Sequence, residues 1–371
     1  MKKAIVLGAA MLLAGAAAFA ADVKFSGRIR VGYNFQFGDT DQTTLKKNPE
    51  GRMNLTIADS DSLWTITFDA ANNATGEKVG GFSDHYYRAK ATIALDKALK
   101  GAGVDLGDVS LKAFGGYYDW YETKNAYNDN PYSDNDVDRM ELNVGTQTDA
   151  ASIVGVTVGY GKLVSVEAVS APYGKDGDGL KPAFAFTATS TPVDGVQVGA
   201  GYGHNVVLGK GNKFGRKAYN DAINASANVD IAKLIKNDKF SLAAAGDFQF
   251  GFEDKDDNQK QYIQALGRVS GGVEKVDGYV EYAYTTIDDL SPVDTYQYMR
   301  AQVNLNMVKG LGLDVYYQDY DLTNEKKEDD FEIGAEAVYT FGGVDYHLDV
   351  AYKAKKDNDN FKITPWIQIA F

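Results

Sequence analysis

Three histidines are the first residues to consider for chemistry, because imidazole moves protons near neutral pH. They are His85, His204 and His347. His347 stands two residues from both Asp345 and Asp349, so on a strand the three share a face and an Asp–His pair is conceivable. No serine accompanies them by motif, and the chain has no cysteine, which excludes thiol catalysis and disulfides. We therefore predict no catalytic residue and no enzyme.

Clusters of carboxylates and glycines are the remaining candidates for a metal or phosphate site. Residues 254–258 and 176–178 bring acids together, but neither segment has the complete ligand pattern of a calcium loop. Residues 209–211 lack the spacing of a phosphate-binding loop. We predict no metal and no cofactor. The formal net charge of −13 argues against nucleic acid as a partner.

The elements that carry these residues are β-strands. Residues 360–371 and 23–37 both alternate between apolar and mostly polar side chains, and a period of two indicates a strand with one apolar face. Pairing of these two strands would close the sheet and leave no edge. The apolar positions of the last strand are Phe361, Ile363, Pro365, Ile367, Ile369 and Phe371.

Residues 1–20 are expected to be a cleaved secretory signal peptide. Lys2 and Lys3 precede an apolar run, and Ala18-Phe19-Ala20 has the small–x–small pattern of a cleavage site. Residues 21–371 then form a single domain without a break in composition. No apolar run in it reaches the roughly 20 residues of a membrane helix, and a barrel needs none because half of each strand is polar.

The alternation predicts an all-β chain of 18 strands, or of 16 if the weak segments near 183 and 263 are misassigned. We assign residues 140–144 as one of these strands, followed by a turn near Thr148 and a strand from Val154 to Tyr160. Residues 163–170 either extend that strand or fold back as a loop element. An even number of strands of about ten residues is typical of transmembrane antiparallel β-barrels.

Outward aromatic residues support a membrane location. They gather near the two ends of the strands, with aliphatic residues between them, as a bilayer requires. The set assigned to the loop-side ends is Tyr33, Phe35, Tyr87, Tyr117, Tyr160, Tyr202, Tyr219, Phe248, Tyr284, Tyr317, Phe331, Tyr352 and Phe361. The set assigned to the turn-side ends is Phe25, Trp64, Phe240, Tyr339, Phe341 and Phe371.

Through its signal peptide, strand count and terminal Phe371, the chain resembles the general diffusion porins among bacterial outer-membrane β-barrels. The resemblance implies a location in the bacterial outer membrane, contact with its lipid, and recognition of Phe371 by the barrel assembly machinery. It also implies a water-filled channel for ions and small hydrophilic solutes. Homotrimers are usual in this family, although no motif in the sequence marks an interface.

Inward charges are unevenly distributed along the chain. The early strands contribute a basic wall, and charged walls in a narrow passage select ions. The basic wall is Arg28, Arg30, Arg52, Arg88 and Lys90. The later strands contribute an acidic wall of Glu281, Asp314, Glu332, Glu336, Asp345 and Asp349.

The loop at residues 121–138 is the candidate constriction loop. In general porins the loop at this place folds into the lumen opposite a basic wall, and the resemblance carries that role to Glu122, Asp129, Asp134, Asp136 and Asp138. The family's own constriction motif is not visible here, and a solvated surface loop is the alternative.

Two rival functions remain at this point. A sugar-selective pore would use inward aromatic residues for stacking, namely Tyr86, Phe114, Tyr118, Tyr279, Tyr296, Tyr298, Tyr316 and Trp366. A surface adhesin or antigen would use the acidic loops and treat the barrel as a support. Conductance across a bilayer distinguishes a pore from an adhesin.

Overall fold

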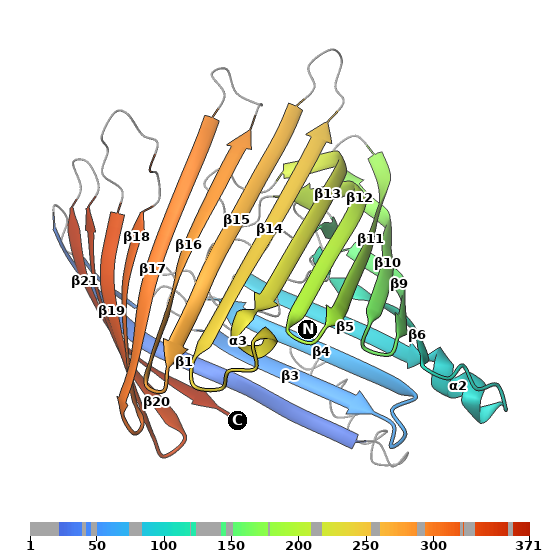
Figure 1. Ribbon diagram of the computed structural model, residues 1–371, viewed down its shortest axis with the longest axis horizontal. Coiled ribbons are helices and arrows are strands. Elements are labelled where there is room, and N and C mark those ends of the chain that lie inside the picture. Colours follow the sequence, from blue (N-terminus) through green and yellow to red (C-terminus); the bar gives the residue numbers. More distant parts are fainter. Residues whose placement is uncertain are drawn as a thin grey trace.

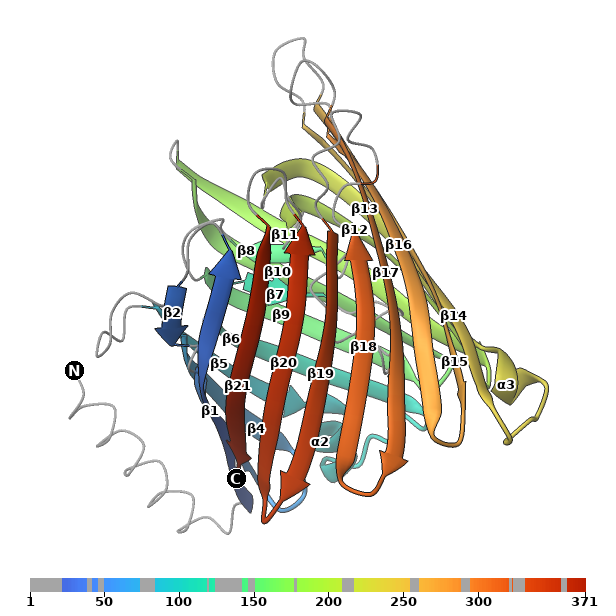
Figure 2. The same ribbon diagram turned by 90° about the vertical axis from the view of Figure 1, so that its left-hand side faces the viewer.

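The computed structural model describes most of the expected mature chain as one closed, antiparallel β-barrel (Figures 1 and 2). The described residues are 22–38, 42–45, 50–73, 84–118, 120–123, 142–145, 151–176, 179–208, 217–253, 260–287, 294–319, 322, 331–354 and 359–371. The predicted signal peptide, residues 1–20, lies outside them.

Eighteen of the described strands form the barrel wall, which confirms the predicted fold class and the favoured strand number. They are β1 (Asp22–Gly38), β3 (Glu50–Ala58), β4 (Trp64–Asn73), β5 (Asp84–Ala94), β6 (Val109–Tyr118), β9 (Ala151–Tyr160), β10 (Val164–Asp176), β11 (Gly179–Val193), β12 (Val196–Leu208), β13 (Lys217–Asp230), β14 (Ser241–Glu253), β15 (Lys260–Val273), β16 (Val276–Ile287), β17 (Asp294–Val308), β18 (Leu311–Asp319), β19 (Phe331–Phe341), β20 (Val344–Ala354) and β21 (Asn360–Ala370). Three short strands accompany them: β2 (Gln42–Leu45), β7 (Trp120–Glu122) and β8 (Asn143–Gly145).

The count is right although two segments were misassigned. Residues 142–144 do not belong to a wall strand, because β6 pairs directly with β9, with Tyr118 opposite Ala151; residues 140, 141 and Thr148 lie outside the described residues. Residues 164–176 are a full wall strand, β10, paired with β9 and β11. The two errors cancel in the total.

The barrel closes where its first and last strands pair, as the two alternating segments predicted. Ile29 faces Ile369 and Phe37 faces Phe361 in the β1–β21 register. The backbone of Phe371 exchanges two hydrogen bonds with Gly27, at 2.7 and 3.0 Å. The rings of Phe25 and Phe371 lie 5.6 Å apart. Closure leaves no unpaired edge in contact with lipid.

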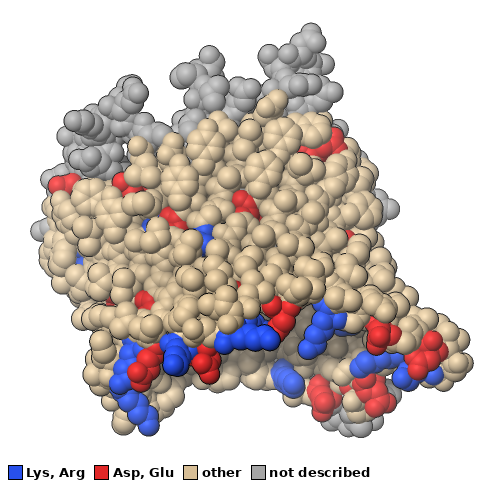
Figure 3. All heavy atoms as spheres, in the orientation of Figure 1, with Lys and Arg blue, Asp and Glu red and all other residues tan. Residues whose placement is uncertain are grey.

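The outward face of the barrel is apolar and exposed. Val280, Val303 and Val315, on three successive strands, expose 53%, 47% and 42% of their surface. Charged groups are sparse on the broad outer face and gather along its lower margin (Figure 3). A continuous apolar belt of this kind indicates a hydrocarbon environment, because exposing so large an apolar surface to water is unfavourable.

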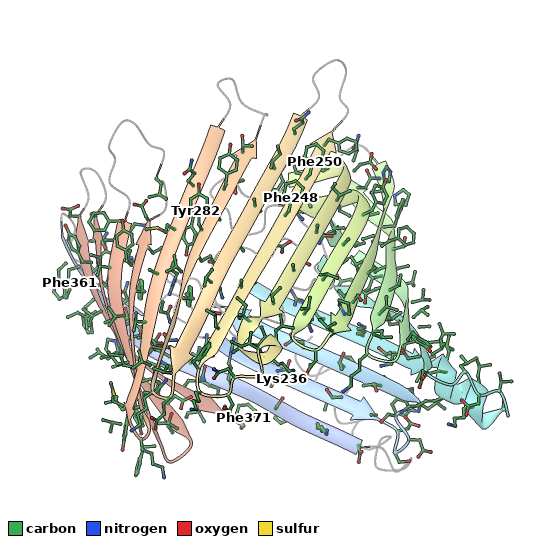
Figure 4. The ribbon with its side chains drawn as sticks, in the orientation of Figure 1. Lys236, Phe248, Phe250, Tyr282, Phe361 and Phe371 are labelled. Carbon is green, nitrogen blue, oxygen red and sulfur yellow. The ribbon has the colours of Figure 1, made fainter. Side chains whose placement is uncertain are left out.

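Aromatic residues border this belt at both ends. Phe248, Phe250, Tyr282 and Phe361 lie toward the loop end, and Phe371 lies at the opposite end (Figure 4). Two of the individual assignments were wrong. Tyr160 ends β9 at a turn-side hairpin, and Tyr219 is buried against the ring of Tyr262, 5.5 Å away.

The turn-side connections include two short helices, α2 (Leu95–Gly101) and α3 (Ile231–Leu234). Asp230 caps α3 by accepting a hydrogen bond from the backbone of Lys233 at 2.9 Å. The Lys233 ammonium pairs with Asp194 of the neighbouring turn at 2.7 Å, and this hydrogen bond raises the pKa of Lys233. None of the helices among the described residues is long and apolar enough to cross a membrane.

Candidate functional site

The predicted basic wall lies on the inward face of β1, β3 and β5. Arg28 stands directly opposite Arg52 in the β1–β3 register, and Arg88 stands opposite Asp69 of β4. Arg28, Asp69 and Arg88 are half-buried. Residues directly opposite in antiparallel strands share a face. We call the basic residues on this face whose side chains are described, namely Arg28, Arg30, Arg88 and Lys90, the basic arc; the side chain of Arg52 lies outside the described residues.

Two members of the basic arc rest on aromatic rings. The Lys90 ammonium lies 4.2 Å from the centre of the Phe114 ring. The guanidinium of Arg30 lies 5.3 Å from the centre of the Trp366 ring. Such cation–π contacts hold long basic side chains in place without neutralising them.

The predicted acidic wall lies on β18, β19 and β20, apart from Glu281. Asp314 stands opposite Glu336, and Glu336 stands opposite Asp349. Asp345 accepts hydrogen bonds from Thr340 at 2.8 Å and from Gln368 at 3.3 Å. We call Asp314, Glu332, Glu336, Asp345 and Asp349 the acidic arc. Glu332 accepts a hydrogen bond from the Tyr316 hydroxyl at 2.7 Å.

The basic and acidic arcs adjoin each other on the barrel wall. Arg30 donates from Nε to Gln368 at 2.7 Å, and Gln368 in turn donates to Asp345. Only β21 separates the acidic strand β20 from the basic strand β1. The two walls inferred from sequence are therefore neighbours around the barrel.

Glu281 belongs to a different environment. In register it stands between Arg268 of β15 and Arg300 of β17. Arg268 donates to Glu281 at 2.6 Å, and these two side chains expose only 2% and 1% of their surface. Arg300 donates to Gln318 at 2.7 Å. Glu281 thus shares a face with these two arginines, and its charge is compensated inside a row of alternating sign.

Inward side chains divide the barrel interior into two halves. Most described inward positions on β17–β21 and β1–β5 are half-buried, and Lys112 of β6 is exposed. By contrast, most described inward positions on β10, β11 and β13–β16 are buried, among them Glu167, Asp247 and Arg268. A packed core would bury both halves. The accessible interior therefore runs along the basic and acidic arcs.

Part of the buried half is covered by the segment that follows β6. β7 and β8 pair with each other, and Asn143 of β8 pairs with Val207 of β12. Leu142 and Val144 are completely buried. They join an apolar cluster with inward residues of the wall, including Ile153, Val169, Ala171, Ala183 and Ala185. The segment therefore lies against the inner wall of the barrel.

We call Leu142 and Val144 the anchors of this segment. The candidate constriction acids precede them in the sequence. Asp129, Asp134, Asp136 and Asp138 lie outside the described residues, as does the side chain of Glu122 on β7. Their role stays a prediction. Sequence patterning missed the anchors themselves, since Leu142 and Val144 alternate in the same way as lipid-facing residues.

The aromatic residues proposed for sugar stacking are mostly hidden where they are described. Phe114, Tyr279, Tyr298 and Trp366 expose 8% of their surface or less, so their faces are covered by neighbours. Tyr316 is half-buried. The side chains of Tyr86, Tyr118 and Tyr296 lie outside the described residues. This arrangement offers no continuous aromatic track among the described side chains.

Known proteins match this chain in their three-dimensional structure but not in their sequence. No protein-family model and no curated protein matches the chain. Among solved structures, OccK11 (OpdR) of Pseudomonas aeruginosa is 9% identical with a TM-score of 0.56, covering 94% of this chain and 96% of that one. The outer membrane protein OprD of the same organism is 10% identical with a TM-score of 0.54, covering 94% of each chain. A BenF-like porin from Pseudomonas fluorescens Pf-5 is 11% identical with a TM-score of 0.57, covering 95% and 99%.

The fold is that of an outer-membrane porin. At such low identity the likeness extends to the fold and carries no residue roles. The predicted resemblance to porins is confirmed at that level, whereas the general-diffusion type stays a prediction.

Proposed function

We propose that this chain is a porin of the bacterial outer membrane, through which ions and small hydrophilic solutes diffuse passively. The observation that carries the proposal is the half-buried charged interior of a closed barrel whose outer belt is apolar. A barrel of this strand number is too wide for wall side chains to fill. Charges kept accessible on one half of the interior favour a wet passage beside them.

Selectivity is proposed to come from the basic and acidic arcs. Because the two arcs lie side by side around the barrel, an ion passing along this half of the interior is close to both positive and negative side chains. Leu142 and β8 pack against the opposite, buried half of the interior, and this position supports a constriction by residues 121–138. The loops as an adhesive surface, the trimer, and recognition of Phe371 by the assembly machinery stay predictions.

The test is ion conductance of the purified protein in planar lipid bilayers, followed by exclusion measurements with neutral solutes of increasing size. Arg28→Glu with Arg30→Glu should shift the reversal potential in a salt gradient toward cation preference, because two positive charges beside the passage become negative. Lys236→Glu is the matched control, since Lys236 lies on a turn-side connection (Figure 4).

Two results would contradict the proposal. Absence of conductance from protein that is folded and inserted in the bilayer would show that the barrel is not an open pore. Identical reversal potentials for the wild type, the double variant and the control would show that the basic arc does not determine ion selectivity.

A further inference from the structure

Three side chains of types that can ligate a metal ion converge on the barrel wall. Glu336 of β19 stands opposite Asp349 of β20, and His347 precedes Asp349 by two residues on the same inward face. One ligand atom from each of the three lies within 4.8 Å of the others. His347 Nδ1 is 2.6 Å from Glu336 Oε1.

The charge around this cluster favours a cation. Asp314, Glu336 and Asp349 stand directly opposite one another across three neighbouring strands. Like charges directly opposite in a sheet destabilise it, so a cation bound among them would relieve repulsion. Glu336 exposes 33% of its side chain, which leaves the cluster open to an ion arriving from the accessible half of the interior.

Trp366 holds two of the three side chains in position. Its indole Nε1 donates to Asp349 Oδ2 at 2.9 Å, and its ring stacks on His347 with a centroid distance of 3.4 Å and an interplanar angle of 10°. The His347 side chain exposes only 10% of its surface. Partners that orient ligands in this way raise metal affinity.

We propose that Glu336, His347 and Asp349 form a binding site for a zinc-like divalent cation on the pore wall. One imidazole and two carboxylates suit zinc and its first-row neighbours better than magnesium or calcium, which prefer oxygen alone. In a tetrahedral zinc site with bonds of about 2.0–2.1 Å, ligand atoms lie about 3.3 Å apart. On binding, the 2.6 Å contact between His347 Nδ1 and Glu336 Oε1 would lengthen to that spacing, the other ligand atoms already lie within 4.8 Å of one another, and a water from the passage would be the fourth ligand.

Binding would also change the pore. A divalent cation cancels the charge of the two carboxylates, so the acidic arc loses its main concentration of negative charge. This consequence rests on the proposed function, whereas metal binding itself does not.

The decisive experiment is calorimetric titration of zinc into the purified full-length protein in detergent. We expect one zinc ion per chain, with weak or no binding of magnesium or calcium. His347→Ala removes a ligand and should weaken zinc binding by at least about 100-fold. Mutation of residues that only hydrogen-bond to a ligand typically weakens binding by about 10- to 100-fold. Glu336→Gln should also weaken zinc binding strongly.

His204→Ala is the matched control. His204 also lies beside a carboxylate, with Nδ1 3.1 Å from Asp221, but its ring stacks on Phe184 of β11, away from the cluster, and we expect unchanged zinc affinity. Trp366→Phe, which keeps an aromatic ring and removes the donor to Asp349, should lower affinity by about 10-fold.

Zinc binding that survives His347→Ala, or that is lost equally in His204→Ala, would overturn the site. Failure of the wild type to bind zinc would do the same. If zinc binds as expected while the protein conducts no ions, the metal site stands and the proposed function fails. If the protein conducts, zinc should shift its reversal potential away from cation preference in the wild type and leave His347→Ala unchanged.

Discussion

At the scale of single residues, two rows of charge on the same inward wall behave differently. On β15, β16 and β17, Arg268, Glu281 and Arg300 alternate in sign, and the Arg268–Glu281 pair is almost completely buried. On β19 and β20, the acidic row through Glu336 and Asp349 places like charges side by side. The first arrangement stabilises the wall, and the second leaves charge available to ions.

The buried pair gives a prediction about stability. Glu281→Gln leaves Arg268 buried without its counter-charge, so the free energy of unfolding should fall by about 3–5 kcal/mol. Urea unfolding of the protein in lipid vesicles measures this loss. Glu332→Gln is the control, because Glu332 is half-buried, and its loss should be clearly smaller. Equal losses in the two variants would mean that the Arg268–Glu281 pair has no special role in stability.

The face of the sheet on which a residue lies could be predicted from the sequence, whereas its burial could not. The period of two assigns Arg28, Asp314 and Asp349 to the face opposite the apolar one, because it reports which side of the sheet a residue takes. It does not report what covers that side, so Glu281 was grouped with the accessible acids. The contact between His347 and Glu336 depends on the register between β19 and β20. The spacing of residues within one strand does not determine that register.

At the scale of elements, β8 shows how a strand pattern can mislead. Leu142 and Val144 alternate with polar residues as a wall strand does, and Val144 does lie in a short strand, which Leu142 immediately precedes. Their apolar partners are side chains on the inner wall, where the pattern predicted lipid. Alternation identifies a strand with one apolar face, but it does not distinguish hydrocarbon from an apolar patch inside a wide barrel.

The anchoring of β8 predicts an effect on the size of the passage. Leu142→Asp places a charge in a completely buried apolar cluster, so the segment should leave the wall and the conductance of single channels should change from a steady level to a variable one. Recordings in planar bilayers measure this. Leu99→Asp on the exposed helix α2 is the control and should conduct like the wild type. A steady wild-type conductance in the Leu142 variant would show that the anchor does not govern the passage.

At the scale of the whole molecule, the barrel is asymmetric around its circumference. Accessible charge occupies the arc from β17 through β21 to β5, and buried side chains line most of the arc from β10 to β16. The strand number alone would suggest a wide, uniform opening. The inward burial pattern instead confines the accessible interior to one side, where the basic and acidic arcs adjoin.

The outer belt leads to the prediction that separates a membrane barrel from a soluble one. Val303 lies on the outward face of β17, directly opposite Gly278 of β16 and Val315 of β18, and exposes 47% of its surface. On a soluble protein, Val303→Lys at so exposed a position would change stability by about 0.5 kcal/mol or less. In a bilayer the lysine faces hydrocarbon, so the free energy of unfolding from vesicles should fall by about 2–4 kcal/mol. Lys309→Ala, on the adjacent turn outside the belt, is the control and should have little effect. A near-neutral Val303→Lys would place this face in water, and the membrane-spanning barrel would have to be abandoned.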